Sequence, residues 1–328
     1  MGVCLATAER GSLYGRYRAW RGPVGVALGG GGARGIAHVG VLEALTSQAS
    51  YDSHGSRGSR GSHPKLKPTI FAGTSAGSVM AVLAAAGLSV EEIREFAVEL
   101  EWFKHIIPVR EVIDFRTISK TGVFPNTRLA EVVNERIGGR SFDELEYDVA
   151  VTATDIENCR RVIITSRRVA RRICRRELER FLPPPKGNFP GAETLVLSDV
   201  DDVGLAVRAS CAVPGFFRPV PIHDMQLVDG GLVDQTPVDV VRAMGARFSI
   251  GVSLALSFMP QKLVNAKHAF SGTIGMLGIQ QLRKSLELAD IGFQVSGIDS
   301  RSPIKPHQVD LIGVGRKDMY DNIARYFG

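Results

Sequence analysis

A serine in a glycine-rich turn is the residue of this chain with the clearest capacity for chemistry. Ser75 is the centre of the sequence GTSAG at residues 73–77, which follows an apolar run at 68–72 and precedes an alanine-rich stretch at 78–86. A serine hydroxyl is a weak nucleophile in water, so enzymes present it on a sharp strand-to-helix turn, next to a base and to backbone N–H groups. The pattern therefore predicts a nucleophile elbow, although many glycine-rich turns contain a serine that does no chemistry.

A second glycine-rich turn has the composition of a site for a negatively charged oxygen. The sequence GGGGARG at residues 29–35 follows an apolar run at 24–28 and opens a stretch with helical apolar spacing at 36–45. Its backbone N–H groups have few side chains in the way and lie at the positive end of the expected helix. In acyl transfer this oxygen is the transition-state oxyanion, and losing one donor to it costs about 3–4 kcal/mol.

The same turn also satisfies the dinucleotide-binding pattern G-x-G-x-x-G, through Gly30, Gly32 and Gly35. That pattern needs an acidic residue at the end of the next strand, about 20 residues further on. Asp52 is at this distance, but it lies in a polar segment, and the next predicted strand leads to Ser75 instead. Nucleotide binding is therefore the less favoured interpretation.

The base that would activate Ser75 is either a late histidine or an aspartate. A hydrolase with the order Ser, acid, His would use His223, His268 or His307, but none of them lies in a convincing site turn. Asp229 stands between a β-rich run and two glycines, where a carboxylate can reach an active-site mouth and accept a serine proton directly. An ordinary aspartate-glycine hairpin turn is the alternative interpretation of Asp229.

Four motifs together give the sequence a specific resemblance. GGGGARG, GTSAG, RASCAVPGFFRPV and VDGGLVDQTPV occur in this order, and between about residues 24 and 254 the chain resembles the patatin-like phospholipase family. The resemblance implies a three-layer α/β fold and hydrolysis of acyl esters in phospholipids or related lipids, without calcium, another metal or a cofactor. It also implies a catalytic dyad of Ser75 and Asp229. The implied oxyanion hole is formed by Gly30, Gly31 and Gly32, with Arg34 nearby, and Gly73 and Gly77 belong to the nucleophile elbow.

The order of apolar patterns predicts one domain with a mainly parallel sheet and helices on both faces. We expect a tail over residues 1–22 and a single domain over 23–328, with polar surface insertions near 47–68 and 167–200. A capping box at residues 89–92 and an apolar-periodic stretch from residue 126 each predict a helix. Runs at 147–154 and 161–165 predict a strand pair. Phe216 and Phe217 are expected in the core.

The net charge of +6 is concentrated in one segment. Residues 160–186, here called the arginine segment, contain nine Arg and one Lys against two Glu, which gives +8 and leaves −2 for the rest of the chain. We hypothesise that this segment docks on anionic membrane through Arg171, Arg172, Arg175 and Arg176. A solvated insertion is the alternative, and no nucleic-acid partner is expected.

Cysteine usage and hydropathy indicate a compartment. The four cysteines form no C-x-x-C pair, and neither a signal peptide nor an 18-residue apolar span is visible. We therefore expect a cytoplasmic protein that contacts the membrane peripherally.

These observations favour a lipid acyl hydrolase of the phospholipase A or lysophospholipase type. A non-catalytic lipid-binding or regulatory module and an acyltransferase remain as alternatives. An acyl channel would need apolar walls, and the candidate residues are Phe103, Ile106, Ile107, Phe216 and Met276, although residues of these types are more often part of a core.

Overall fold

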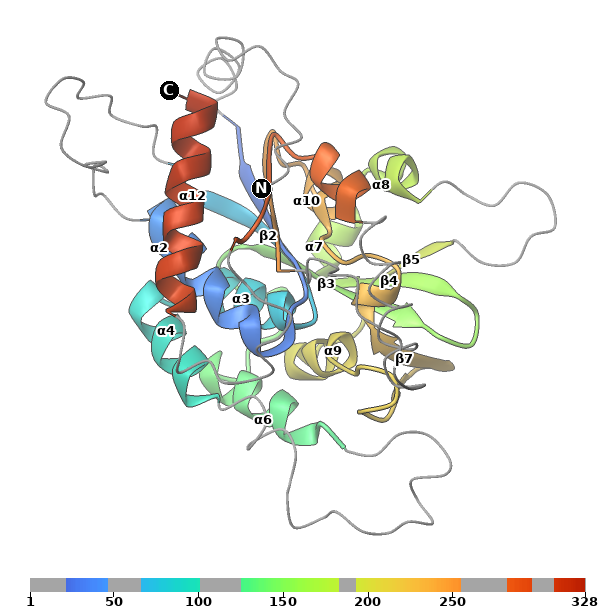
Figure 1. Ribbon diagram of the computed structural model, residues 1–328. Coiled ribbons are helices and arrows are strands. Elements are labelled where there is room, and N and C mark those ends of the chain that lie inside the picture. The colour runs from blue at the N-terminus through green and yellow to red at the C-terminus, as the bar shows by residue number, and fades with distance from the viewer. Residues whose placement is uncertain are drawn as a thin grey trace, which may run out of the picture.

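Nine strands of the described chain form one sheet at the centre of the fold (Figure 1). The structure is a computed structural model that describes residues 22–46, 66–100, 125–182, 193–254, 282–296 and 310–327. The main strand order is β5-β4-β3-β2-β1-β8-β9, while β7 also pairs with β3, and β6 pairs with β7. The strands are β1 (Val24–Leu28), β2 (Pro68–Thr74), β3 (Asp148–Asp155), β4 (Arg160–Thr165), β5 (Thr194–Leu197), β6 (Val220–Ile222), β7 (Met225–Asp229), β8 (Phe248–Ser253) and β9 (Ile291–Gln294).

The sheet is mainly parallel, as the sequence predicted. Strand β1 pairs in parallel with β2 and β8, and β2 pairs in parallel with β3. Among the described strands, only the pairs β3/β4, β3/β7 and β6/β7 are antiparallel. The carboxyl ends of β1, β2 and β3 therefore meet at one edge of the sheet, where loops can bring side chains together.

The sheet is buried on both faces because successive side chains of its strands point to opposite sides. In β1, Val26 and Leu28 pack into the larger core cluster, whereas Ala27 packs into the smaller one. Figure 1 shows the two helical layers on either side of the sheet. The larger core lies under α2 (Ala37–Thr46), α3 (Ala76–Ala85), α4 (Val90–Glu99), α6 (Thr127–Arg136), α9 (Val203–Ser210) and α12 (Leu311–Phe327), and the smaller under α7 (Arg167–Ala170), α8 (Arg175–Phe181) and α10 (Val238–Ala243).

Local sequence signals account for several of these elements. Ser89 caps α4 with a complete capping box, in which its side chain accepts from the N–H of Glu92 and the Glu92 carboxylate accepts from the N–H of Ser89. The predicted strand pair is the antiparallel β3/β4 ladder. Helix α6 begins after Asn126 and is followed by two glycines with positive φ, Gly138 and Gly139.

The segment 167–200 differs from the surface insertion that we predicted. Its described parts contribute α7, α8 and the edge strand β5 to the fold. Val169 of α7 and Leu178 of α8 are buried in the smaller core cluster with residues of the sheet. A single buried apolar residue is enough to attach a short helix to a core, so the high charge of this segment did not exclude it from the fold.

Several sequence expectations lie outside the described residues. These are most of the tail, the insertion at 47–65, two candidate histidines and four candidate channel residues, namely His268, His307, Phe103, Ile106, Ile107 and Met276. The helices of the described ranges are all too short or too polar to span a lipid bilayer.

Candidate active site

Ser75 occupies a strained turn between β2 and α3. Its backbone has φ 52° and ψ −128°, a conformation that residues other than glycine rarely adopt. Such strain costs on the order of 1–3 kcal/mol and persists only where the surroundings hold it in place. A serine in this conformation at a strand-to-helix turn is the geometry of a nucleophile elbow.

The glycines on either side of Ser75 are required by close backbone approach. A Cβ at Gly77 would lie 2.0 Å from the carbonyl oxygen of Leu28 and 2.7 Å from that of Gly29. A Cβ at Gly73 would lie 2.4 Å from the carbonyl oxygen of Gly77. The turn therefore packs directly against the end of β1, which brings the GGGGARG turn beside Ser75.

Two serine side chains hold the backbone of Ser75. The Ser75 N–H donates to Oγ of Ser210 at 2.8 Å, and the Ser210 hydroxyl donates to the carbonyl oxygen of Thr152 at 2.7 Å. The Ser75 carbonyl accepts from the hydroxyl of Ser78 at 2.6 Å and from its N–H at 2.8 Å. Ser210 and Ser78 are both fully buried. These contacts stabilise a backbone conformation that would otherwise relax.

Asp229 ends β7 at the same edge of the sheet. Its N–H donates to the carbonyl of Ala212 at 3.0 Å, and its carbonyl accepts from the hydroxyl of Thr154 at 3.0 Å. The carboxylate accepts the N–H of Gly231 at 2.8 Å and interacts with the hydroxyl of Ser75. The structure therefore brings Ser75 and Asp229 together, although 154 positions separate them in the chain.

Burial sets the electrostatics of Asp229. Desolvation raises the pKa of its carboxyl to about 6, against the hydrogen bonds of Ser75 and Gly231, which lower it. At neutral pH the carboxyl is therefore mostly ionised but holds a proton much more readily than an exposed aspartate does. This is the range in which a carboxylate can take a proton from a substrate or nucleophile and return it.

The turn at residues 29–35, here called the glycine loop, lies beside Ser75 but does not offer all the donors that we predicted. A Cβ at Gly30 would come within 3.2 Å of Cβ of Ser75. The N–H of Gly30, however, donates to the carbonyl of Gln235 at 3.1 Å. In the described chain the N–H groups of Gly31 and Gly32 have no acceptor, so they are the donors available to an oxyanion.

Arg34 folds back on the glycine loop. Its Nε donates to the carbonyl of Gly31 at 2.9 Å, within the short helix η1 (Gly32–Ile36). One Nη atom is buried and has no hydrogen-bond partner among the described residues. Arg34 therefore shapes the loop from one side and holds one unused donor.

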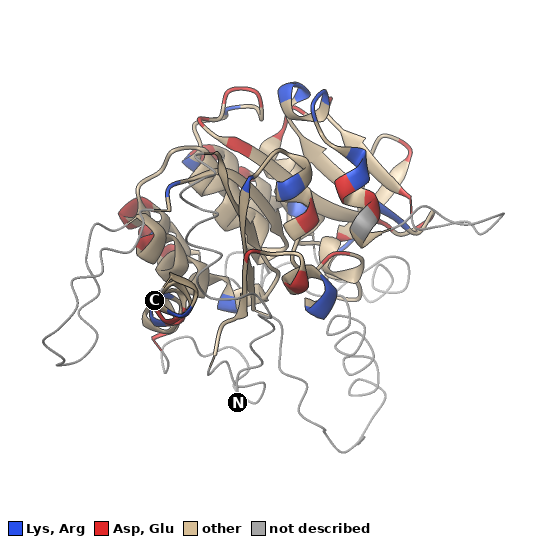
Figure 2. Ribbon diagram, turned by 90° about the horizontal axis from the view of Figure 1, so that it is seen from above, with Lys and Arg blue, Asp and Glu red and all other residues tan. Residues whose placement is uncertain are grey.

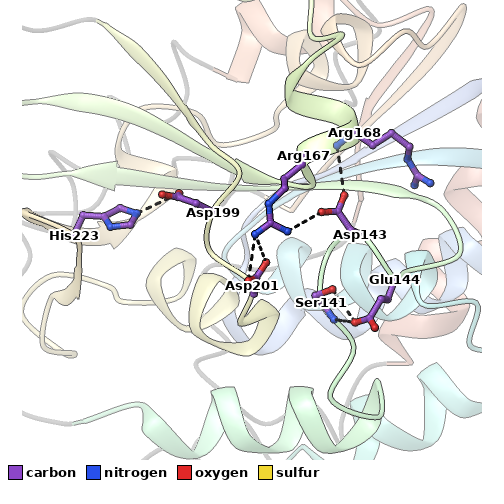
Figure 3. A network of polar contacts seen from close by, with 8 residues as sticks. All are labelled: Ser141, Asp143, Glu144, Arg167, Arg168, Asp199, Asp201 and His223. Atoms are coloured by element: carbon purple, nitrogen blue, oxygen red, sulfur yellow. Dashed lines mark hydrogen bonds and ion pairs between the residues drawn. The ribbon is translucent and has the colours of Figure 1, made fainter.

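Neither of the two described histidines is hydrogen-bonded to Ser75. His38 is fully buried and donates from Nε2 to the carbonyl of Gly29 at 2.8 Å, and burial lowers its pKa to about 4. This neutral histidine supports the glycine loop. His223 is exposed on the turn between β6 and β7, with Nε2 3.3 Å from Asp199, as Figure 3 shows. The described ranges contain no cluster of His, Cys, Asp or Glu fit to hold a metal ion.

Three residues that contact Ser75 or the glycine loop were not predicted as site residues. They are Ser210, Cys211 and Gln235. Cys211 is buried against the side chains of Ser75 and Ser78, and desolvation together with the charge of Asp229 raises the pKa of its thiol. It is therefore a neutral thiol that packs beside the carboxylate. Ser210 and Cys211 lie in the RASCAVPGFFRPV motif, so the motif itself was the signal for them.

The turn that follows α9 corrects one expectation. Phe216 was predicted in the core, but 52% of it is exposed, while Phe217 is half-buried against the larger core cluster. Gly215 has φ +82°, so the turn reverses there and points one phenyl ring outward. Val213 in the same turn is also exposed. An apolar turn therefore follows directly after the residues that contact Ser75 and Asp229.

Arg168 and Arg172 of the arginine segment lie at the other end of the sheet from Ser75. Both form ion pairs with Asp148, the first residue of β3. Ser75 lies further along the sheet, because it follows Thr74, which pairs with Thr152 of β3. Four residues of strand separate these positions, roughly 13 Å.

Acidic residues neutralise part of this charge. Arg167 lies between Asp143 and Asp201 (Figure 3). Figure 2 shows basic and acidic residues interspersed over the described elements. Arg168 and Arg172 are therefore distant from the candidate site, and the membrane contact predicted for Arg171, Arg172, Arg175 and Arg176 stays a prediction.

The chain is similar in sequence to several known proteins. The chain is 27% identical over 233 residues to the uncharacterized NTE family protein Rv1063c of Mycobacterium tuberculosis, covering 70% of this chain and 49% of that protein. It is 26% identical over 251 residues to patatin-like phospholipase domain-containing protein 7 of Rattus norvegicus, covering 76% and 15%. The chain thus spans about half the length of the first of these relatives and less of the second.

Among solved structures, VipD from Legionella pneumophila is similar with a TM-score of 0.45 at 13% identity, over 94% of this chain and 67% of VipD. The type III effector protein ExoU is similar with a TM-score of 0.45 at 14% identity, over 93% of this chain and 54% of ExoU.

A family assignment follows from the extent of one match. The profile of the patatin-like phospholipase family aligns with residues 26–242, from the strand before the glycine loop to the helix after Asp229. This range is two thirds of the chain and contains every residue of the candidate site described above. The chain belongs to the patatin-like phospholipase family.

Proposed function

We propose that the protein is a lipid acyl hydrolase of the phospholipase A or lysophospholipase type, with Ser75 as nucleophile and Asp229 as base. One observation carries the proposal: a serine in a strained elbow shares its hydroxyl with a buried carboxylate whose pKa is raised to about 6. Membership of the patatin-like phospholipase family supports acyl esters of lipids as the substrate class.

The geometry is suited to an acyl-enzyme mechanism in two halves. In the first, Ser75 Oγ attacks the ester carbonyl while its proton passes to Asp229, and the N–H groups of Gly31 and Gly32 hold the oxyanion. Collapse of the tetrahedral intermediate breaks the ester bond, and the alcohol leaves with the proton from Asp229. In the second half Asp229 takes a proton from water, hydroxide attacks the acyl-enzyme, and Ser75 leaves with that proton. A single carboxylate thus acts as base and acid in turn.

The test combines covalent labelling with turnover. A fluorophosphonate probe, which phosphonylates an activated serine, is applied to the wild type and to Ser75→Ala and Asp229→Asn, and hydrolysis of a short-chain ester and of phospholipid vesicles is measured in parallel. We expect both labelling and turnover in the wild type and neither in Ser75→Ala. Asp229→Asn is expected to lower both by at least about 100-fold while remaining folded.

The same experiment separates the alternatives. A folded wild type without labelling or turnover would point to a non-catalytic lipid-binding or regulatory module. Product that shifts from free fatty acid to a new ester when an alcohol or lysolipid is added would point to acyl transfer. Labelling that survives both Ser75→Ala and Asp229→Asn would refute the assigned dyad.

A further inference from the structure

Both main-chain polar groups of Gly30 are hydrogen-bonded to one residue of another loop. Its N–H donates to the main-chain carbonyl of Gln235 at 3.1 Å, and its carbonyl accepts from Nε2 of the Gln235 side chain at 2.9 Å. A Cβ at Gly30 would come within 3.1 Å of the same Nε2 and 3.2 Å of Cβ of Ser75. Gln235 therefore contacts the glycine loop at the residue that lies against the nucleophile.

These contacts fix the direction of the next N–H group. None of the described peptide bonds is cis, and in a trans peptide the N–H points opposite to the carbonyl. With the Gly30 carbonyl held by Gln235, the N–H of Gly31 points away from Gln235. Arg34 holds the next carbonyl, that of Gly31, and so fixes the N–H of Gly32. The directions of the Gly31 and Gly32 N–H groups are therefore each fixed by a side chain that donates to the carbonyl of the preceding residue.

Gln235 also connects the glycine loop to the carboxylate. It ends the stretch 229–235, here called the base loop, which begins at Asp229 and contains the short helix η2 (Gly230–Leu232). The N–H of Asp234 donates to the carbonyl of Gly230 at 2.9 Å. The hydroxyl of Thr74, next to Ser75, donates to the carbonyl of Asp234 at 2.8 Å. The base loop is therefore tied to both the nucleophile strand and the glycine loop.

We propose that Gln235 is a positioning residue that orients the Gly31 N–H for the oxyanion and couples the glycine loop to the base loop. The inference rests on the proposed function, because it assigns a role in the same acyl-transfer step. An oxyanion donor acts only if its direction is set before charge develops. Loss of the side-chain clamp leaves the Gly30 carbonyl free to rotate, and the donor rotates with it.

The test removes the donor but keeps the volume of the side chain. Gln235→Met has a similar length and no N–H, and Gln235→Glu has the same shape with only acceptor atoms facing the Gly30 carbonyl. Both variants keep the main-chain bond from Gly30, so they isolate the contact of Nε2. Gln226→Met, at a half-buried glutamine of β7, is the matched control. Thermal melting shows whether each variant is folded.

The readout separates transition-state effects from general loosening. Steady-state kinetics on a soluble short-chain ester are combined with inhibition by an alkyl boronic acid, which bonds to a serine oxygen and mimics the tetrahedral intermediate. For both Gln235 variants we expect kcat to fall about 10- to 100-fold, KM to stay within about threefold, and the boronic acid inhibition constant to rise with the fall in kcat. The Gln226 control is expected to match the wild type.

Two outcomes would overturn the inference. Wild-type kcat and boronic acid affinity in both Gln235 variants would refute the role of Gln235 while leaving the proposed function intact. A wild type that shows neither ester turnover nor fluorophosphonate labelling would remove the proposed function, and the inference with it. If Gln235→Met does not fold, Gln235→Glu and the shorter amide Gln235→Asn carry the same comparison.

Discussion

Replacing Asp229 by asparagine should abolish activity and at the same time stabilise the fold. Burial raises the pKa of this carboxyl from its ordinary value of 3.8 to about 6, and the hydrogen bonds from Ser75 and Gly231 are already included in that balance. One pH unit corresponds to 1.36 kcal/mol, so the ionised carboxylate costs the folded state about 3 kcal/mol at neutral pH. Asparagine has nearly the same shape and carries no charge, and we expect it to recover on the order of 1–3 kcal/mol.

The pH dependence of this gain follows from the direction of the shift. Below pH 3.8 the Asp229 carboxyl is protonated in both the folded and the unfolded chain, and wild type and variant should be nearly equal in stability. Between about pH 4 and 6 the unfolded chain ionises first, so wild-type stability from this group falls as pH rises through the folded pKa. The advantage of Asp229→Asn should therefore grow over this interval and become constant above it.

The assay is urea unfolding followed by circular dichroism at several pH values between 4 and 8, on the wild type, Asp229→Asn and Asp224→Asn. Asp224 is exposed on the turn between β6 and β7, so the same substitution there should change little at any pH. Other buried acids titrate in all three proteins and cancel in the difference. A variant less stable than the wild type at pH 7, or a gain that is the same at pH 4.5 and 7.5, would refute the reasoning.

Four further predictions follow from the site and the surface. The rate kcat/KM for a soluble ester should rise with pH and reach half of its plateau near pH 6, where the base ionises; a flat profile between pH 5 and 8 would exclude Asp229. Ser210→Ala should leave the Ser75 N–H buried without an acceptor, lowering the free energy of unfolding by about 1–3 kcal/mol in urea titrations and slowing fluorophosphonate labelling. Gly77→Ala should abolish labelling and markedly lower the melting temperature, because its Cβ would lie 2.0 Å from a backbone oxygen. Neutralising three exposed arginines at the far end of the sheet, Arg171, Arg175 and Arg176, should change hydrolysis of anionic vesicles less than about twofold. A larger loss would show that this end of the sheet does meet the membrane.

The parts of the fold that could be predicted are those encoded by neighbouring residues. A run of apolar residues ending in glycines predicts a buried strand and a tight turn, and the capping box at Ser89 predicts the start of α4. The elbow at Ser75 was predictable for the same reason, since Gly73 and Gly77 permit the close approach that the turn needs. The sequence around Asp229 is also compatible with an ordinary hairpin turn. The resemblance of four motifs to one family was needed to predict it as the base.

The contacts that complete the candidate site join residues far apart in the chain, so no pattern of neighbouring residues predicts them. Ser210 bonds to Ser75 across 135 positions, and Gln235 bonds to Gly30 across 205. A serine or a glutamine in a sequence is compatible with a solvated surface position, and only the closure of the sheet decides otherwise. Phe216 shows the reverse case, since a phenylalanine is more often buried than exposed and the turn at Gly215 points it outward.

The arginine segment shows how charge misleads when its partners are distant in sequence. Arg161 was counted with the surface charges, yet it is fully buried, and one of its Nη atoms lies 2.8 Å from both Asp234 and Asp239. Its guanidinium also lies 5.4 Å from the ring of Phe181 in α8, so the helix that we took for an insertion forms one wall of this cluster. An arginine this deeply buried is tolerated only with such compensation.

This buried cluster has a consequence for the site, because Asp234 belongs to the base loop. Its carboxylate is held by Arg161 on one side of the sheet, while its carbonyl holds Thr74 beside the nucleophile. The next residue, Gln235, holds the glycine loop. A loop anchored by a buried ion cluster has little freedom to move, and oxyanion donors act best when their direction is fixed in advance. The helical layer over the smaller core therefore supports the candidate site through the base loop, although none of its described helices contributes a residue to the proposed dyad.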